Sequence, residues 1–451
     1  MRATSRAVPN AMQNATNVAI VGSGISGLAC AWLLSQRYRV TLFEAAPRLG
    51  GHTNTVDVTL DGKTHPVDTG FLVFNEKTYP NLIALFATLG VESVQTEMSF
   101  AVSLENPDLE WAGSSLATVF GQKRNLLRPA FWTMLSDILR FNRESTAWLT
   151  VHPGDERPLG DFLKEGRYSD AFADWYLLPM AAAIWSCPTA QMRDMPLATF
   201  VRFCQNHGLL QIFDRPMWRT VRGGGREYVN KIAAQLDDVR LASPVQRVTR
   251  EASGLRVTHA HGSEVFDQVV LACHSDQSLA ILGETASAGQ REVLASVRYQ
   301  PNRAVLHTDA RLLPRDRKLW SAWNYFAGSG DPGSQPVGVS YLINRLQPLP
   351  FETPVVVTLN PAREPNPEKI IAEFDYDHPI FDASAIAAQQ RLADDRLGIQ
   401  GEGGVWLAGA WGRFGFHEDG LRSALRVANL MGIAAPWQKV PASLSPAVAR
   451  A

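Results

Sequence analysis

NVAIVGSGISGLACAWLLSQRYRVTLFE, residues 17–44, is the stretch that decides the fold. Its short apolar run, residues 18–21, is typical of a parallel strand that is buried on both faces. Of the glycines that follow, Gly22 allows a tight turn, Gly24 lets the backbone approach a pyrophosphate, and Gly27 lets a helix pack closely on the strand. The order of strand, glycine turn and helix predicts a dinucleotide-binding site.

The second half of the stretch strengthens this prediction. The helix expected over residues 25–35 points its N-terminal N–H groups and the positive end of its dipole at the phosphates. A second strand, residues 40–43, ends at Glu44, where an acid about 20 residues beyond the glycine turn accepts hydrogen bonds from a ribose diol and disfavours NADP. The alternative, a purely structural glycine turn, does not require an acid at this distance.

The segment after Glu44 points to a larger cofactor. Arg48, Gly50 and Gly51 lie just beyond the second strand, where they can reach back over the same pyrophosphate. Plain NAD dehydrogenases do not need this second clamp, whereas a two-part cofactor such as FAD does. The next apolar strand, residues 67–75, is interrupted by Gly70, where the backbone can approach a flat ring.

Composition narrows the function classes. The 43 basic and 44 acidic residues leave a net charge of −1, so no nucleic-acid partner is expected. The 4 scattered cysteines predict a reducing compartment, a cytoplasmic location and no structural metal. The apolar runs are far shorter than the ~20 residues that span a membrane, and residues 1–16 lack the apolar core of a signal peptide and predict a disordered leader.

Changes of pattern along the chain predict two interleaved domains. Strands and glycine turns mark the cofactor domain, whereas a mainly helical segment and a segment of short strands with Pro-rich and Gly-rich turns mark a substrate domain. The predicted limits are 17–77, 221–290 and 400–436 for the cofactor domain, 78–220 and 291–399 for the substrate domain, and 437–451 for a flexible tail.

Five motifs in this order carry a resemblance to a known family: GSGISGLACA with Glu44, PRLGG, VRGGGREYVNKI, SPVQRV and WLAGAWGRFGFHEDGLRSALRVA. The chain resembles the flavin-containing amine oxidase and phytoene desaturase superfamily over nearly its whole length. The resemblance implies an α/β fold, in which a Rossmann-type FAD domain like that of glutathione reductase is joined to a discontinuous, amine-oxidase-like α+β substrate domain. It also implies an oxidoreductase with non-covalent FAD.

A closer resemblance rests on DTGFLVFNEKTYPNL, EMSFAVSL, IWSCP, FCQNHGLLQIFDRPMW and GFHEDGL. These segments are similar to bacterial predicted FAD-dependent oxidoreductases that are related to the N-terminal domain of plant cyclopropane fatty acid synthases. The implied reaction is the dehydrogenation, or desaturation, of a lipid acyl chain, with O2 or another electron acceptor. Two alternatives stay open: an amine or porphyrinogen oxidase, and a non-redox accessory flavoprotein for a fatty-acid methyltransferase.

The resemblance also implies roles by position. The backbone at Val245 contacts adenine, Gly409 precedes the ribityl contact, and residues 418–421 begin a helix whose dipole faces the flavin pyrimidine and stabilises the anionic reduced ring. The predicted cofactor-binding residues are Gly22, Ser23, Gly24, Ile25, Ser26, Gly27, Glu44, Ala45, Arg48, Gly50, Gly51, His52, Gly70, Phe71, Val245, Gly409, Glu418, Asp419, Gly420 and Leu421.

Three departures from the amine oxidase pattern disfavour amine oxidation. Ala410 stands where an acid is common, and His417 stands where an aromatic cage residue is common. Where these oxidases often carry a lysine that binds a water at flavin N5, the nearest residues are Asn302 and Arg303. The cofactor motifs themselves are intact.

Desaturation requires the loss of a proton as well as a hydride, so a base near the flavin is expected. His417 is the predicted catalytic base, because it enters the helix that faces the flavin and has an ordinary pKa of ~6.5; the alternative is that it packs on the ring or caps the helix. Covalent attachment of flavin to His52 is disfavoured. The predicted substrate-lining residues are His307, Trp323, Tyr325, Trp411 and Phe416, although a solvated strand end for His307 with Asp309, and a core role for the strand aromatics, remain alternatives.

Residues 124–141, RNLLRPAFWTMLSDILRF, combine arginines with large apolar residues. They predict either an interfacial helix that gives peripheral contact with the inner face of the membrane, or an amphipathic helix that covers its own core.

Overall fold

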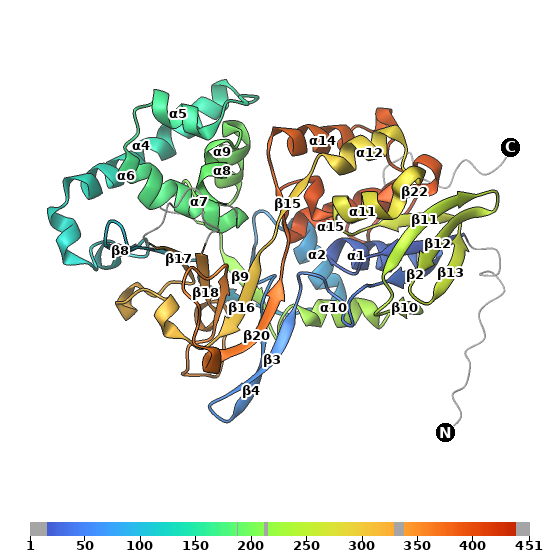
Figure 1. Ribbon diagram of the computed structural model, residues 1–451, viewed down its shortest axis with the longest axis horizontal. Helices are drawn as coiled ribbons and strands as arrows, with labels where there is room; N and C mark the ends of the chain where they lie inside the picture. The colour runs from blue at the N-terminus through green and yellow to red at the C-terminus, as the bar shows by residue number, and fades with distance from the viewer. Residues whose placement is uncertain (1–15, 187, 212–214, 329–337, 439–451) are drawn as a thin grey trace.

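The computed structural model describes residues 16–186, 188–211, 215–328 and 338–438. Figure 1 shows a parallel sheet flanked by helices on one side of the molecule and a second, mixed sheet with a helical layer on the other. The predicted leader lies outside the described residues except for residue 16. The predicted tail lies outside them except for residues 437 and 438.

The parallel sheet of five strands forms the centre of the cofactor domain. Its order is β10-β2-β1-β14-β22, and every neighbouring pair is parallel. Residues 18–20 of β1 are wholly buried because helices cover one face of the sheet, whereas a three-stranded antiparallel sheet and further helices cover the other, which explains the unbroken apolar run. The strands are β1 (Asn17–Val21), β2 (Arg39–Phe43), β10 (Asp238–Arg240), β14 (Gln268–Leu271) and β22 (Val405–Leu407), and the principal helices are α1 (Ile25–Leu34), α10 (Arg226–Ala233), α11 (Ser275–Leu282), α12 (Ala288–Ala295) and α15 (His417–Leu430).

The substrate domain is built on a sheet of seven strands in the order β20-β16-β19-β18-β17-β7-β8. All neighbours are antiparallel except β17 and β7, which are parallel. Two segments far apart in the chain therefore complete one sheet. The strands are β7 (Phe100–Leu104), β8 (Leu109–Ala112), β16 (Arg303–His307), β17 (Trp323–Ala327), β18 (Gly338–Leu342), β19 (Val356–Leu359) and β20 (Ile370–Asp375).

Helices cover one side of this sheet (Figure 1). They include α4 (Pro129–Val151), α5 (Leu159–Glu165), α7 (Leu178–Trp185) and α9 (Leu197–Asn206). Within this helical segment, a π-helical turn, Ala173–Leu177, precedes α7. Pro179 in the first turn of α7 has no N–H to donate, and proline in a continuous helix would break its hydrogen bonding.

Residues 262–271 form two strands, β13 (Gly262–Phe266) and β14, and Asp267 between them accepts a hydrogen bond of 2.7 Å from the backbone N–H of Asn17. β13 belongs to an antiparallel sheet with β11 (Val245–Glu251) and β12 (Gly254–His259).

Packing also departs from the predicted domain limits. The helix α2 (Pro80–Leu89) buries Leu82, Leu85 and Phe86 in the same core as α1 and α15. The helix α14 (Ala383–Ala393) packs against α12 in the core of the cofactor domain. Both helices therefore belong by packing to the cofactor domain, although the segments that contain them were assigned to the substrate domain.

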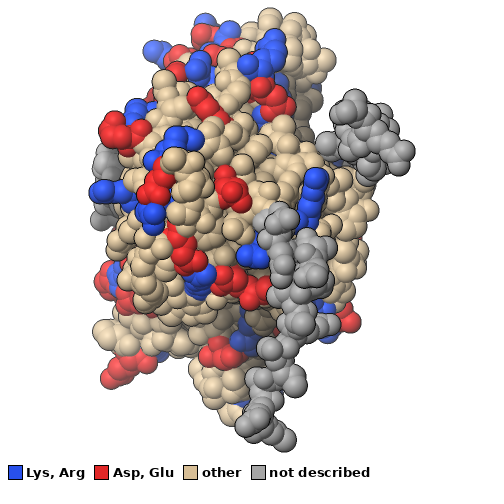
Figure 2. All heavy atoms as spheres, turned by 90° about the vertical axis from the view of Figure 1, so that its right-hand side faces the viewer, with Lys and Arg blue, Asp and Glu red and all other residues tan. Residues whose placement is uncertain are grey.

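The structure also shows how the charged side chains are distributed and which cysteines are free. On the face seen in Figure 2, acidic and basic side chains are interspersed. Three described cysteines, Cys30, Cys204 and Cys273, are free thiols. Within the described ranges, no cluster of His, Cys, Asp or Glu is suited to hold a metal ion, and no helix of these ranges has the length and apolar character needed to cross a bilayer.

Candidate cofactor site

In the glycine turn between β1 and α1, protein atoms crowd the first and third glycines, whereas the space beside the middle one is empty. Gly22 has φ +97°, and a Cβ on Gly27 would lie 1.8 Å from the carbonyl oxygen of Gly22. A Cβ on Gly24, by contrast, would meet nothing within 4 Å. The structure thus leaves room for a ligand beside the glycine at which a pyrophosphate is expected to approach.

Two helix N-termini meet at this turn. α1 begins after Gly24 with no side-chain cap and no acid in its first turn, so its N-terminal N–H groups stay available to an anion. The Ser26 hydroxyl donates a hydrogen bond of 3.0 Å to the carbonyl oxygen of Gly420, in the first turn of α15. The motifs near the two ends of the chain therefore form one site.

Glu44 lies at the tip of β2 and contacts the turn directly. Its carboxylate accepts hydrogen bonds from the backbone N–H of Ser23 at 2.8 Å and from that of Ala46 at 2.8 Å. The Ser23 hydroxyl also accepts a hydrogen bond from the backbone N–H of Gly50 at 3.1 Å. The carboxylate is therefore held at the place where a ribose diol is expected.

The loop after β2 packs over the glycine turn as a second clamp. A Cβ on Gly51 would lie 3.1 Å from the Cα of Gly24, so the two backbones approach closely. Arg48 donates a hydrogen bond of 2.9 Å to the carbonyl oxygen of Gly51, which fixes its guanidinium inside this loop. The cationic group and the two glycines suit the pyrophosphate of a dinucleotide.

His52, the next residue, is the centre of a buried aromatic cluster. Its ring stacks on Tyr376 at 5.1 Å and on His378 at 5.5 Å between ring centroids, and His274 lies 6.3 Å away. Burial first, and then the neighbouring His378 and His274, lower the pKa of His52 well below its usual value. The buried Nε2 atom has no hydrogen-bond partner in the protein, so a neutral ring with a free nitrogen lies beside the phosphate clamp.

These observations show that the residues fit a dinucleotide cofactor. The space beside Gly24, the uncapped N-terminus of α1 and the unpartnered Nε2 of His52 each require a polar ligand or leave room for one. The residues that would hold FAD are those of the glycine turn, Glu44 and the loop containing Arg48 and His52.

His417 is half-buried at the start of α15 and packs within the cofactor domain. Its ring stacks on Phe71 with 3.7 Å between centroids, and its Nε2 is 2.8 Å from the Thr53 hydroxyl and 3.3 Å from that of Tyr228. Burial lowers the pKa of His417 to about 3, so the ring is neutral and weakly basic at neutral pH. This geometry favours the packing role that the sequence also allowed over the predicted role as base.

The partly buried ring of His417 makes the free energy of unfolding depend on pH. Because the folded pKa is about 3 and the unfolded value is 6.5, the unfolded state binds the proton first, and the stabilisation is lost as pH falls from 6.5 toward 3. We expect the unfolding free energy of the wild type, relative to that of His417→Gln, to fall by about 2 kcal/mol between pH 7 and pH 5. Urea unfolding at each pH measures the difference, and parallel profiles for the two proteins would contradict it.

The side chains of Glu418 and Asp419 face the protein and not the cofactor. Glu418 accepts hydrogen bonds from the Asn81 amide at 2.7 Å and from the backbone N–H of Leu82 at 3.0 Å, at the start of α2. Asp419 accepts one from the backbone N–H of Phe416 at 3.2 Å and so caps its own helix. Only the backbone of this turn, with Gly420 and Leu421, remains for contact with a cofactor.

Gly70 makes a close approach to another segment of the chain, since a Cβ at this position would lie 2.1 Å from the carbonyl oxygen of His52. Its approach to a flat ring stays a prediction. The backbone N–H of Phe71 donates to the same oxygen at 2.9 Å. Gly409 is extended, with its backbone N–H bonded to the Ser423 hydroxyl at 2.9 Å, and Val245 is buried at the start of β11.

The structure separates the five predicted substrate-lining residues. Phe416 lies where the cores of the two domains meet, stacked on Phe203 at 5.2 Å and 5.7 Å from His207. His307 instead lies inside the mixed sheet, with its Nε2 2.8 Å from the Thr358 hydroxyl, and it is not a solvated strand end. Of the other three, Trp323 is half-buried and packs against Tyr341. Tyr325 is buried in the core of the substrate domain, and Trp411 is buried in the core of the cofactor domain.

Sequence reasoning did not single out Tyr376, His378 or His274. Tyr376 and His378 follow β20, and His274 follows β14. A run of aromatic and histidine residues at the end of a strand, FDYDHP, was the available signal. Asn302 lies beside this cluster, 3.3 Å from the Nδ1 of His378, whereas Arg303 forms ion pairs with Glu364 and Glu373.

The comparison with known families agrees with this site. Residues 25–431 match the family model of flavin-containing amine oxidoreductases. The chain belongs to this family. Membership confirms the predicted family, the FAD cofactor and the class of flavin-dependent oxidoreductase.

Two curated relatives are carotenoid phi-ring synthases. The protein of Streptomyces griseus is 27% identical over 311 residues, which cover 63% of this chain and 57% of that protein. The protein of Chlorobaculum tepidum is 27% identical over 181 residues, which cover 36% of this chain and 27% of that protein. The chain therefore spans less than two thirds of the length of these relatives.

Solved structures share the fold over nearly the whole chain. A fatty acid isomerase from P. acnes that produces CLA has a TM-score of 0.63 at 15% identity. Cyclohexylamine oxidase from Brevibacterium oxydans IH-35A has a TM-score of 0.62 at 18% identity. Each match covers 92% of this chain and 98% of the other, and confirms the predicted fold class.

Proposed function

We propose that the protein is an FAD-dependent oxidoreductase that dehydrogenates a lipid acyl chain, such as an unsaturated or methyl-branched fatty acyl group. The substrate loses one hydrogen as a hydride and one as a proton, and a carbon–carbon double bond forms. Bound FAD supplies the hydride acceptor, and O2 or another electron acceptor then takes the electrons. Because such a substrate resides in a bilayer, the proposal includes a cytoplasmic enzyme in contact with the inner face of the membrane.

The neutral, aromatic character of the residues around the cofactor loops carries this proposal. His52, Tyr376 and His378 form one stacked group, and Phe416 with Phe203 forms another at the junction of the domains. The acids nearby are engaged in hydrogen bonds within the protein, as described for Glu44, Glu418 and Asp419. A cationic amine would lack a free carboxylate here, whereas an acyl chain requires none.

The printed names of similar proteins add support. One solved structure with this fold is a fatty acid isomerase, and both curated relatives are named for a carotenoid. Cyclohexylamine oxidase has the same fold, so the fold by itself does not select the substrate.

In this proposal, His52 is the base that accepts the proton lost by the substrate. Burial lowers the pKa of both His52 and His417, so the choice between them rests on hydrogen bonding: the Nε2 of His52 has no partner, whereas the Nε2 of His417 is already bonded to Thr53. Asn302, next to His378, is placed to orient the stacked histidines. His52 accepts the proton at Nε2, and His417 supports the ring packing of the loop.

Anaerobic mixing of the FAD-loaded protein with lipids tests this proposal. We expect unsaturated or methyl-branched acyl lipids to bleach the flavin absorption band and amines to leave it unchanged. With equal FAD loading, His52→Gln is expected to slow the bleaching at least tenfold, and His417→Gln less than threefold, since general bases contribute about 10²–10⁴ in rate. Rapid bleaching by amines and none by any acyl lipid would overturn the proposal.

A further inference from the structure

A cluster of large apolar side chains is exposed at the edge of the substrate domain. Leu116, in α3 (Leu116–Val119), is 79% exposed, and Leu127, at the end of the 3₁₀ helix η2 (Lys123–Leu127), is 87% exposed. Leu126 is 46% exposed, and Trp132, in the first turn of α4, is 50% exposed. We call these four residues the apolar tips. The Trp132 indole N–H donates to the carbonyl oxygen of Leu126 at 3.0 Å, and its ring packs at 5.1 Å on Phe120, which ends α3, so these segments adjoin. Scattered apolar residues are normal at a surface, but a group on adjoining segments marks an interaction site.

The helix α4 supplies only Trp132 to this surface. Its residues Phe131, Met134 and Phe141 are wholly buried, so its main apolar face covers the core of the substrate domain. For residues 124–141, the main apolar face of the helix thus packs inward, and the exposed apolar residues are Leu126 and Leu127 in the turn before α4 and Trp132 and Leu139 on its outer side.

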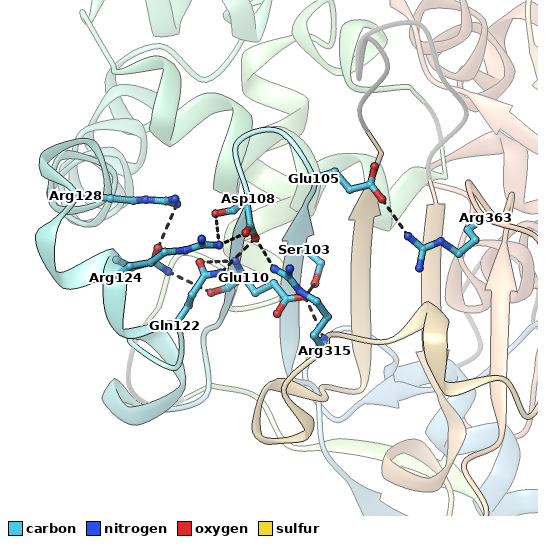
Figure 3. Close-up of polar contacts among 10 residues, drawn as sticks. Ser103, Glu105, Asp108, Glu110, Gln122, Arg124, Arg128, Arg315 and Arg363 are labelled. Carbon is cyan, nitrogen blue, oxygen red and sulfur yellow. Dashed lines mark hydrogen bonds and ion pairs between the residues drawn. The ribbon is translucent and has the colours of Figure 1, made fainter.

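A network of polar contacts holds these turns in place (Figure 3). The Asn125 amide is buried and donates to the carbonyl oxygen of Glu110 at 3.2 Å, and the Gln122 side chain accepts from the backbone N–H of Glu110 at 3.1 Å. Asp108 forms ion pairs with both Arg124 and Arg315. These hydrogen bonds to Glu110 of β8 fix the turn. Leu126 and Leu127, which follow Asn125, are therefore held in exposed positions.

The same surface is basic. Residues 111–136 contain Lys123, Arg124 and Arg128 and no acid. Arg317 and Lys318 are exposed on the neighbouring 3₁₀ helix, whose Leu319 packs against Gly121. The nearest acids are Asp108, Glu110 and Asp316, and the first two are engaged in the ion pairs of the network. Apolar tips surrounded by cations complement an anionic bilayer, in which apolar groups enter the interface while Lys and Arg contact phosphates.

We propose that the apolar tips and their surrounding cations dock the protein on an anionic lipid bilayer. Leu116, Leu126, Leu127 and Trp132 insert at the level of the headgroups, and Lys123, Arg128, Arg317 and Lys318 contact lipid phosphates, while Arg124 stays paired with Asp108. This attachment is separate from the chemistry of the cofactor site, since no residue of the surface belongs to that site.

Sedimentation of the FAD-loaded protein with vesicles tests the proposal. We expect binding to phosphatidylglycerol-rich vesicles, weaker binding to pure phosphatidylcholine vesicles, and loss of binding at high salt. The double variant Leu116→Ser with Leu127→Ser is expected to bind at least tenfold more weakly. The matched control, Ile371→Ser with Leu397→Ser, removes exposed apolar side chains elsewhere and is expected to bind like the wild type.

Three results would overturn this docking surface: no binding of the wild type to anionic vesicles, equal binding by both double variants, or a self-association of the wild type that the Leu116 and Leu127 variant abolishes. The last result would assign the surface to contact between copies of the chain. Flavin bleaching by dispersed acyl lipids, measured without vesicles, keeps a failure of the proposed reaction distinguishable from a failure of membrane docking.

Discussion

Gly24→Ala is expected to weaken FAD binding at least tenfold while the unfolding free energy of the apoprotein stays within about 0.5 kcal/mol of the wild-type value. The backbone at Gly24 has φ −63° and ψ 178°, which alanine adopts without strain, and its Cβ would meet no protein atom within 4 Å. The added methyl group would instead occupy the space in which the pyrophosphate approaches the backbone. Flavin fluorescence titration measures the affinity, and urea unfolding measures stability.

Two other glycines complete this experiment. Gly154→Ala is the matched control, because a Cβ there also meets nothing within 4 Å and the residue lies in an exposed loop of the substrate domain. Gly27→Ala is expected to lower both affinity and stability, since its Cβ would overlap the carbonyl oxygen of Gly22. Unchanged FAD affinity in Gly24→Ala would show that the pyrophosphate lies elsewhere.

Glu418→Ala is expected to lower the unfolding free energy by about 3 kcal/mol or more, because hydrogen bonds to a charged group contribute about 1.5–3 kcal/mol each. The buried carboxylate accepts from the Asn81 amide, from the backbone N–H of Leu82 and from Arg422 at 3.0 Å. Its loss would leave the N–H groups at the start of α2 without a partner. Urea unfolding of the apoprotein is the measurement.

Glu284→Ala serves as the control for this variant, since the Glu284 side chain is fully exposed and its one ion pair is long, at 3.9 Å. We expect its stability to match that of the wild type within about 0.5 kcal/mol. A destabilisation by Glu418→Ala as small as that of the control would show that α2 and α15 do not depend on this carboxylate.

The sequence predicted the parts of the site in which the interacting residues are close together in the chain. Gly22 requires glycine because its φ is positive, and Gly27 requires it because a Cβ would overlap the carbonyl oxygen of Gly22. Glu44 follows at the end of the next strand. These constraints act within about 30 residues, so they are readable in one stretch of sequence.

The remainder depends on contacts that no local pattern encodes. His52 meets Tyr376 and His378 only because the end of β20 lies beside the loop after β2. Glu418 was expected at the start of a helix that faces the flavin, and its side chain binds the N-terminus of α2, more than 300 positions away in the chain.

The hydrogen bond between Ser26 and Gly420 joins residues 394 positions apart. The ribosome therefore synthesises the whole of the mixed sheet and its helical layer before it synthesises α15, which completes the cofactor site. During synthesis, α1 must remain without its partner α15, with the apolar residues of that contact exposed to chaperones. Flavin capture is thus a property of the finished chain, and a truncated translation product that stops before α15 is expected to remain colourless.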